Sequence, residues 1–421
     1  MRIKVDENGN WRSFRHRNFR ILYPANALSN IGTWAQRVAQ DWLVLELTNN
    51  NGAYLGLVTA IQFAPVLFFS LQGGAMADRI DKRKLLIWTN IIAAIACYAL
   101  GILVVTGVIQ LWHVFLCAAV LGISSALDAP IRQSFTAEIV GHSDVANAVS
   151  LNSANFNAGR LVGPALSGFL IARFSTGPSF LINATTYLFV ILSLLFMRPS
   201  DFFIQKKEET LGTIREGLRY ARARPDLYVV MALVFFAATF GLNFQIFNAL
   251  MATKEFGKGP ASYGLLGTFI AVGSLSGALL SARLERFRDA KLVMRLGVWF
   301  SLVVIVLSVM PTYTWYSVWL PICGISALTM LISANSYVQV NSDPSVRGRV
   351  MGIYLLVFMG GTPLGSLLIG YLTEAVGTRE TIALCGGISL LFCVLIWIFF
   401  NKKVERPADL RVSSVLGKQT S

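Results

Sequence analysis

Charged residues are scarce in this sequence. They make up 14% of its 421 residues, whereas a soluble domain carries roughly 25%. A soluble fold of this length could bury a large core, but it would still need a charged surface. The charges here are too few and too clustered to supply one, and the apolar share of 55% points to a membrane protein instead.

The motifs of common catalytic and metal sites are missing too. There is no HExxH motif, no Ser-His-Asp spacing and no G-x-x-x-x-G-K-[ST] loop, which argues against an enzyme and against an ATP-driven pump. No short apolar run with a small-residue cleavage site follows the basic N-terminus, so no cleaved signal peptide is expected. The cysteines all lie in apolar runs without a CxxC partner, as small core residues do, and predict neither a disulfide framework nor a metal site; they are Cys97, Cys117, Cys323, Cys385 and Cys393.

Long uncharged runs are what the sequence has in abundance. A bilayer core of roughly 30 Å is crossed by about 20 apolar helical residues, and inside lipid such a segment must be helical to satisfy its backbone. The single runs are 52–77, 174–197, 227–253, 260–282 and 350–373, the runs long enough for two helices are 85–127 and 296–342, and the runs with internal polar residues are 21–47, 145–172 and 381–400. The sequence therefore predicts an all-α integral membrane protein with twelve transmembrane helices.

The basic residues fall on one side of these spans. With a cytoplasmic N-terminus, the N-terminal arm, every second connection and the tail hold all but six of the 36 Lys and Arg residues; the six are Arg37, Arg160, Arg173, Lys254, Lys258 and Arg379. Cytoplasmic loops carry such an excess, so we expect a protein of the bacterial plasma (inner) membrane with both termini in the cytoplasm. The same distribution explains the net charge of +14 without a nucleic-acid partner.

A long polar stretch divides the spans into six and six. We predict a cytoplasmic arm over 1–20, a six-helix bundle over 21–197, a cytoplasmic linker over 198–225, a second six-helix bundle over 226–400 and a cytoplasmic tail over 401–421. Within the linker, 211–222 is interpreted as an amphipathic piece at the membrane surface, with a plain solvated linker as the alternative.

The two halves repeat each other weakly. The basic turn 78–83 after span two returns as 283–288 after span eight, and Gly163-Pro164 in span five returns as Thr362-Pro363 in span eleven. Paired, pseudo-symmetric six-helix bundles are typical of transporters, and channels and receptors do not usually show them. We therefore expect the partners to be the lipid bilayer and a small-molecule substrate, and the protein to be a monomer.

Span one carries a polar stripe at helical spacing. Its members are Asn26, Asn30, Thr33, Arg37, Gln40 and Asp41. A polar face on a membrane helix is expected to line a water-filled cavity that receives the substrate. The alternative is a buried ion pair between Arg37 and Asp41, four residues apart, that holds helices together.

Three other spans contribute polar residues. In span four, Asp128 and Arg132 are predicted to form a structural gate pair, with a proton carrier as the alternative. Span seven offers Asn243, Gln245 and Asn248, which either line the other cavity wall or cross-link helices.

Span five presents Asn152, Asn155, Gly159 and Gly163 along one face. We assign the asparagines to the cavity and the glycines to close helix packing. Arg160, in mid-span, costs roughly 2.5–3.5 kcal/mol to insert, so it needs a partner or an anion, and Asp41 and a substrate carboxylate both remain candidates.

These residues resemble the major facilitator superfamily. The stretch 74–84, GAMADRIDKRK, looks like its loop motif between spans two and three, with Asp81 where the second glycine stands. The stretch 159–168, GRLVGPALSG, is similar to the span-five motif of its proton-coupled exporters, including Pro164 and Gly168, with Ser167 where a glycine is common. Within the superfamily, the branch of enterobactin exporters and related bacterial efflux proteins is the nearest likeness, carried by 32–34, 39–44, 128–133 and 147–152.

The resemblance implies two bundles that rock about a central site. Asp78, with Arg79 and Arg83, would gate one state through the start of span eleven, near 347–350, where a carboxylate close to a helix N-terminus is favoured. It also implies proton-driven export of a siderophore, drug or similar metabolite, with the proton as coupling ion and no cofactor. By their positions in the spans, and not by the resemblance, Asp41, Asp128 and Arg160 are the candidates for a role in coupling. Uptake by the same fold and a non-transporting membrane scaffold or sensor are the alternatives.

Overall fold

The computed structural model describes Gly9 and residues 11–203, 214–284, 289–344 and 346–404. Residues 1–8 and 10 of the predicted arm, the middle of the predicted linker, and the tail from residue 405 lie outside the described residues. The described part is helical almost throughout, and its long helices are α1 (Arg17–Leu47), α2 (Gly52–Arg79), α3 (Lys82–Val105), α4 (Leu111–Val140), α5 (Val145–Phe174), α6 (Gly177–Leu195), α10 (Pro260–Arg283), α11 (Ala290–Ser308), α12 (Tyr313–Asn341), α13 (Arg347–Ala375) and α14 (Thr378–Val404).

The seventh span is broken into four pieces. Helices α8 (Pro225–Phe236) and α9 (Phe244–Leu250) alternate with two π-helical turns, Ala237–Gly241 and Met251–Glu255. Ten described segments, counting this one as a single span, are long and apolar enough to cross a membrane. Helices α1 and α5, which carry the polar residues predicted from the sequence, bring the number of spans to twelve.

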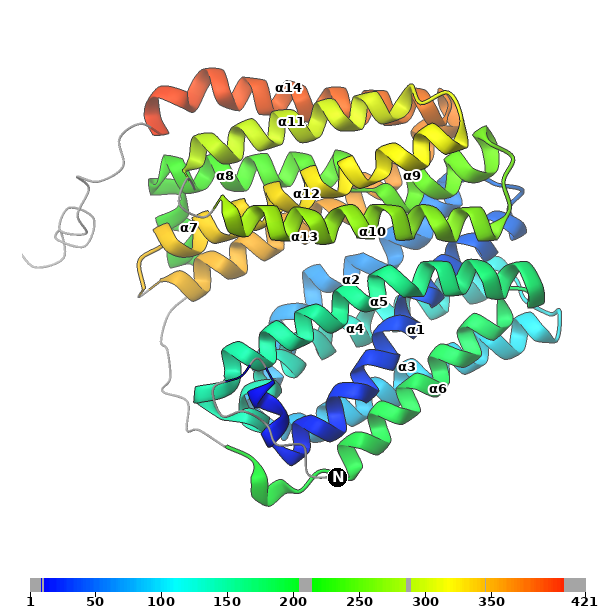
Figure 1. The fold of residues 1–421 in the computed structure, drawn as a ribbon, viewed down its shortest axis with the longest axis vertical. Coiled ribbons are helices and arrows are strands. Elements are labelled where there is room, and N and C mark those ends of the chain that lie inside the picture. The colour runs from blue at the N-terminus through cyan, green and yellow to red at the C-terminus, as the bar shows by residue number, and fades with distance from the viewer. Residues whose placement is uncertain (1–8, 10, 204–213, 285–288, 345, 405–421) are drawn as a thin grey trace, which may run out of the picture.

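The spans form two six-helix bundles, one from α1–α6 and one from α8–α14 (Figure 1). Between the bundles the main contacts are α2 with α13 and α5 with α10. Helices α2 and α10 are the second spans of their halves, and α5 and α13 are the fifth, so the pseudo-symmetry of the halves relates the two interfaces.

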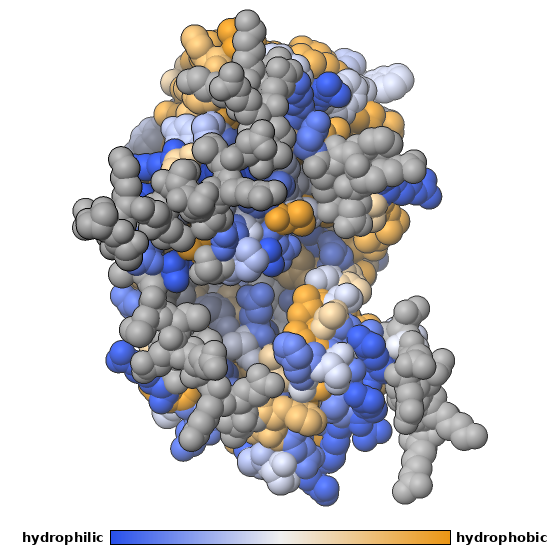
Figure 2. Space-filling view, turned by 90° about the vertical axis from the view of Figure 1, so that its left-hand side faces the viewer, coloured by the Kyte–Doolittle hydropathy of each residue, from blue (hydrophilic) through white to orange (hydrophobic). Residues whose placement is uncertain are grey.

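The bundles meet at one end only. We call this the far end, where α1 ends at Leu47 and α2 begins at Gly52, and we call the other the linker end, where α6 ends and α8 begins. Toward the linker end the ribbons splay apart (Figure 1). Figure 2 looks onto the linker end and shows a hollow between the halves with hydrophilic residues inside it.

Glycines allow the close approach at the far end. A Cβ added to Gly56 on α2 would lie 3.0 Å from the Cα of Gly370 on α13, and one added to Gly264 on α10 would lie 3.0 Å from the Cα of Gly168 on α5. Both distances are too short for a side chain, so the backbones themselves form the contact. Small residues play this part between membrane helices generally.

The second described part of the linker folds into a short helix, α7 (Ile214–Ala223). The Arg349 guanidinium donates to the Glu216 carboxylate across 2.7 Å, and the Tyr220 hydroxyl accepts from the Asp343 backbone N–H across 3.1 Å. Just beyond the helix, the hydrogen-bonded Asp226 carboxylate raises the pKa of Arg224 above its ordinary value. This part of the linker is thus docked on the C-terminal bundle, while 211–213 of the predicted amphipathic piece lie outside the described residues.

The N-terminal arm is also folded where it is described. The carboxylate of Asp144, in the α4–α5 connection, lies 2.8 Å from Arg15 Nε and 2.7 Å from His16 Nε2, with Arg12 Nε at 3.4 Å. The Ser13 hydroxyl donates to the Asn147 side chain across 2.6 Å. These contacts fix the arm to the linker end of the N-terminal bundle.

The far-end contact predicts the effect of adding bulk to a glycine. Gly56→Val places a branched side chain against α13, and overpacking of this kind should lower the free energy of unfolding by about 1–3 kcal/mol. Unfolding in a graded series of sodium dodecyl sulfate concentrations measures it. Gly387→Val on α14 is the control, because an added Cβ there meets nothing within 4 Å; equal stability of the two variants would contradict the account.

Candidate functional site

The polar stripe of α1 reaches several neighbours. Toward the linker end, Asn26 accepts a hydrogen bond from the Arg132 guanidinium across 2.6 Å. In mid-span, the Thr33 hydroxyl lies 3.4 Å from the Tyr187 hydroxyl of α6. Toward the far end, Gln40 donates to the Gln62 side chain of α2 across 2.9 Å.

Asp41 joins the two halves. Its Oδ2 atom accepts from the Gln245 amide of α9 across 2.5 Å and from the Tyr263 hydroxyl of α10 across 2.7 Å. The side chain is 2% exposed, and Trp42 next to it stacks on the Tyr263 ring. An ionised carboxylate accepts stronger hydrogen bonds than a neutral group, so these two bonds between the halves are stronger when Asp41 is charged.

The ion pair between Arg37 and Asp41, the alternative interpretation of the stripe, is not formed. The Asp41 carboxylate is directed at the C-terminal half, and the Arg37 guanidinium instead lies over two aromatic rings, 4.8 Å from the centre of Trp34 and 5.4 Å from that of Phe63. The fixed-pair interpretation of this part of the stripe is therefore wrong for this state.

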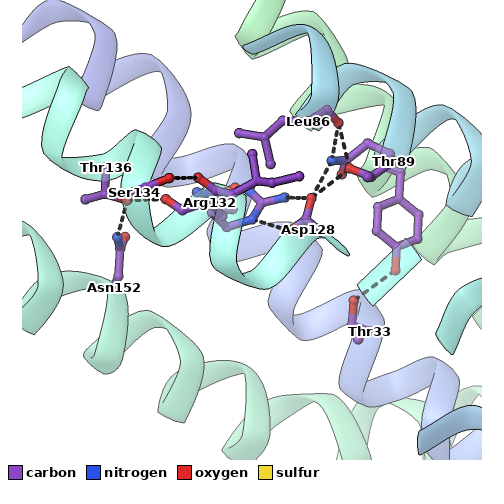
Figure 3. Close-up of polar contacts among 12 residues, drawn as sticks. Thr33, Leu86, Thr89, Asp128, Arg132, Ser134, Thr136 and Asn152 are labelled. Carbon is purple, nitrogen blue, oxygen red and sulfur yellow. Dashed lines mark hydrogen bonds and ion pairs between the residues drawn. The ribbon is translucent and has the colours of Figure 1, made fainter. Parts of the chain in front are cut away.

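Asp128 and Arg132 form the centre of a polar cluster within the N-terminal half (Figure 3). Arg132 donates twice to the Asp128 carboxylate, across 2.7 and 2.9 Å. The same carboxylate accepts from Thr89 across 3.0 Å and from Asn90 across 3.1 Å. With the Asn26 contact, the cluster ties α1, α3 and α4 together near the linker end.

The small residues of α5 set its distance from α1. A Cβ added to Gly159 would lie 2.8 Å from the carbonyl carbon of Asn30, and one added to Gly163 would lie 2.6 Å from Trp34 Cβ. The predicted cavity residues Asn152 and Asn155 make weak contacts in the same half, 3.5 Å to the Thr136 hydroxyl (Figure 3) and 3.4 Å to the Tyr23 carbonyl.

Arg160 has no carboxylate partner among the described residues. Its guanidinium lies 5.8 Å from the centre of the Trp34 ring, and the Asp41 carboxylate, one of its two candidate partners, is bound elsewhere. A substrate anion is the candidate that remains.

Of the three polar residues predicted on span seven, Gln245 alone reaches the other half. Asn243 donates to the Thr239 carbonyl of its own span across 2.8 Å, and Asn248 accepts from the Tyr316 hydroxyl of α12 across 3.0 Å. The helix is broken at Leu242–Asn243. Asn243, at the break, bonds within its own span, whereas Gln245 and Asn248, after the break, bond to other helices.

The predicted gate residues lie at the linker end. Asp81 caps α3 by accepting from the Arg83 and Lys84 backbone N–H groups, which explains the departure from glycine in the loop motif. The Arg83 side chain donates to the last carbonyls of α6, and Arg79 is exposed. The side chain of Asp78 lies outside the described residues, so its predicted contact with the start of α13 stays a prediction.

Two contacts at the far end have no signal in the sequence. Tyr263 lies in the first turn of α10 and looks like an interfacial aromatic. Glu374, near the end of α13, accepts from the Gly52 backbone N–H across 2.6 Å and from Lys254 across 2.5 Å, so it ties the start of α2 to the C-terminal half. A groove of about 440 Å³ opens at the same end between the halves, lined in part by Trp42, Glu46 and Lys258.

Comparisons with known proteins agree with this architecture. The family model described as "Transmembrane secretion effector", a model of the major facilitator superfamily, matches residues 8–419. The chain belongs to the major facilitator superfamily. Its members are transporters, so this chain is a multi-pass membrane transporter and not an enzyme, as the loop motif and the paired halves predicted.

Several relatives lie in the efflux and siderophore branch. The staphyloferrin A transporter of Staphylococcus aureus is 24% identical over 92% of this chain and 97% of its own. The multidrug efflux pump Tap of Mycolicibacterium fortuitum is 26% identical over 86% and 90%, and the enterobactin exporter EntS of Shigella boydii is 23% identical over 93% of each.

Solved structures share the fold. A bacterial homologue of the human lysosomal transporter Spinster, in an inward-facing and occupied conformation, superposes with a TM-score of 0.75 at 16% identity and covers 95% of this chain and 100% of that one. The nucleoside transporter NupG gives a TM-score of 0.71 at 15% identity and covers 91% of this chain and 99% of that one.

The polar cluster predicts a stability cost that can be divided between its members. Asp128→Ala leaves the Arg132 guanidinium without its carboxylate and should lower the free energy of unfolding by about 1–3 kcal/mol. The double variant Asp128→Ala, Arg132→Ala should recover part of that loss, because it leaves no unpaired charge. Thermal unfolding in detergent measures both. If the two substitutions were independent, the double variant would lose the sum of the stabilities lost in Asp128→Ala and Arg132→Ala. Such an additive loss would contradict a paired role.

Proposed function

We propose that this transporter exports a small molecule, such as a siderophore or drug, by alternating access driven by protons, and that it works as a monomer. The observation that carries the proposal is the buried Asp41 carboxylate, which accepts two hydrogen bonds across the contact between the halves at the far end. Any motion that opens the far end must break both bonds.

The named relatives support export rather than uptake. By the distribution of basic residues the linker end is cytoplasmic and both termini lie in the cytoplasm of a bacterium. The halves are separated at that end (Figures 1 and 2). This state therefore exposes the central site to the cytoplasm, as both export and uptake require at one step. The direction of export is supported by the relatives, which include a multidrug efflux pump and an enterobactin exporter.

The protonation state of Asp41 biases the equilibrium between states. When ionised, the carboxylate holds Gln245 and Tyr263 by charge-assisted bonds and stabilises the closed far end. When protonated, it loses its charge and part of those bonds, so the far end opens more readily. A proton that reaches Asp41 from outside once the far end has opened would keep that end open while the substrate leaves, and release of the proton to the cytoplasm would restore the charged carboxylate and favour the closed far end again.

The driving force is sufficient for concentrative export. One charge crossing 100 mV yields about 2.3 kcal/mol, which supports a gradient of roughly 50-fold per proton before any contribution from a pH difference. No cofactor is needed for such a cycle.

Transport in inverted membrane vesicles tests the export of a panel of siderophores and cationic drugs. An imposed pH gradient, acidic inside, should drive accumulation, and a protonophore should abolish it. Accumulation in right-side-out vesicles instead would show uptake and would overturn the proposal.

Two matched carboxylate variants test the coupling role. Asp41→Asn should remove the dependence of transport on the pH gradient, because the neutral side chain cannot titrate. Asp128→Asn should keep that dependence, because its carboxylate holds a structural cluster within one half. A pH-driven rate in Asp41→Asn equal to that of the wild type would refute the assignment.

The orientation has its own test. Green fluorescent protein fused after Ser421 should fluoresce, and alkaline phosphatase fused at the same place should be inactive, because both report a cytoplasmic end. An active phosphatase fusion would show that the C-terminus lies outside the cytoplasm. The proposed orientation, and with it the proposed direction of transport, would then be wrong.

A further inference from the structure

We propose that Arg37 and Arg160, whose guanidinium groups both lie near the Trp34 ring, form an anion-binding subsite that takes the carboxylate of a lipophilic substrate. The inference deepens the proposed function, on which it rests, by giving the substrate a chemical class. It stands on the placement of the two guanidinium groups.

The two arginines share one aromatic ring. Their guanidinium carbons lie 4.8 and 5.8 Å from the centre of the Trp34 indole. The close packing of Gly159 and Gly163 against α1 brings them together, because a side chain at either glycine would push α5 away. A cation over an indole ring is held by the ring quadrupole, so Trp34 fixes the position of both groups.

Neither charge is neutralised within the described part of the chain. Arg37 and Arg160 form no ion pair and no hydrogen bond there, and the Nε atom of Arg37 is buried without an acceptor. Both side chains are half-buried; charges withdrawn from water are normally paired, and two like charges repel each other more strongly as water is removed. An anion bound between them would remove both costs.

Both arginines lie on the open side of the contact between the halves. Arg37 is one helical turn before Asp41, where α1 meets the C-terminal half. Arg160 is next to Leu161, whose carbonyl accepts from the Thr268 hydroxyl of α10 across 3.0 Å, and one turn before Pro164, which packs on α10. Since both helices run from the linker end, a ligand entering there reaches the arginines before it reaches the closed end.

The surroundings favour a particular kind of anion. The Phe63 ring lies 5.4 Å from the Arg37 guanidinium, and the Phe156 ring packs edge-on against Trp34 at 5.6 Å. Aromatic walls bury an apolar body, and planar guanidinium groups bind carboxylates through paired hydrogen bonds. A carboxylate attached to an aromatic or other apolar group fits both features, whereas a cationic drug would face two positive charges.

Binding of a matched acid and amide tests the subsite directly. Radiolabelled 2-naphthoate and 2-naphthamide have the same shape and differ in charge, and equilibrium dialysis against the detergent-purified protein, corrected with protein-free micelles, measures both. The wild type should bind the acid at least about tenfold more tightly than the amide, the change expected for one charge-assisted hydrogen bond. Equal affinities, or no binding of the acid, would overturn the proposal.

Substitutions at the two arginines test whether the preference for the acid arises at this subsite. Arg37→Gln and Arg160→Gln should each lose the preference for the acid, and Arg37→Lys and Arg160→Lys should keep part of it. Arg20→Gln, an exposed position on the same helix, should leave the preference unchanged. Retention of the full preference in both glutamine variants would show that the acid binds elsewhere. If the glutamine variants do not fold, the lysine variants and the ratio of the two affinities in the wild type still test the subsite.

A stability measurement separates ligand binding from a structural role. Without a ligand, Arg37→Gln should melt no lower than the wild type, because relief of the repulsion between Arg37 and Arg160 offsets the loss of the contacts with Trp34 and Phe63. The stabilisation by 2-naphthoate should disappear. A lower melting temperature with the stabilisation retained would show a structural arginine. These assays use no gradient, so acid binding without pH-driven transport would refute the coupling alone, and transport without acid preference would refute the subsite alone.

Discussion

The structure depends on a carboxylate placed between two bundles that must separate. Asp41 is shielded from water and held by one amide and one hydroxyl from the other half. Around it the halves approach so closely that glycines are required, at Gly56 and Gly370 and again at Gly168 and Gly264. Close packing makes the far end rigid, and in the proposed cycle the charge of Asp41 makes its closure sensitive to protons. The hollow at the linker end (Figure 2) follows, because two rigid bundles in contact at one end are apart at the other.

The remaining polar residues described in the N-terminal half fall into two groups, those with partners inside that half and those without. The Asp128 cluster and the arm residues around Asp144 are satisfied inside the N-terminal half, so they keep that bundle intact while it moves. Arg37 and Arg160 differ because their charges are unpaired in the part of the chain that the structure describes. Charges within the membrane are costly, and an uncompensated pair on the side from which substrate enters is best explained by a ligand that compensates it.

The sequence predicted the fold well, because the membrane restricts it strongly. Uncharged runs of fixed length must be helices, and basic loops suggest their orientation, so the twelve spans and their division into halves could be inferred without contacts. The stripe on α1 was also visible from its spacing. The partners of its residues were not, since an i, i+4 interval fits an ion pair between Arg37 and Asp41 equally well. Tyr263 and Glu374 were missed because their role arises only when a helix from the other half packs against them.

Distances measured at both ends of one protein test the central claim that the halves rock about this contact under control of Asp41. Spin labels on exposed positions can report the far end, at Tyr54 and Tyr371, and the linker end, at Arg79 and Val340; the native cysteines are buried and should stay unlabelled. Electron–electron double resonance should show far-end distances that lengthen on acidification as linker-end distances shorten, and Asp41→Asn should abolish the response to pH. Distances at the two ends that change independently, or a far end that never opens, would contradict the account.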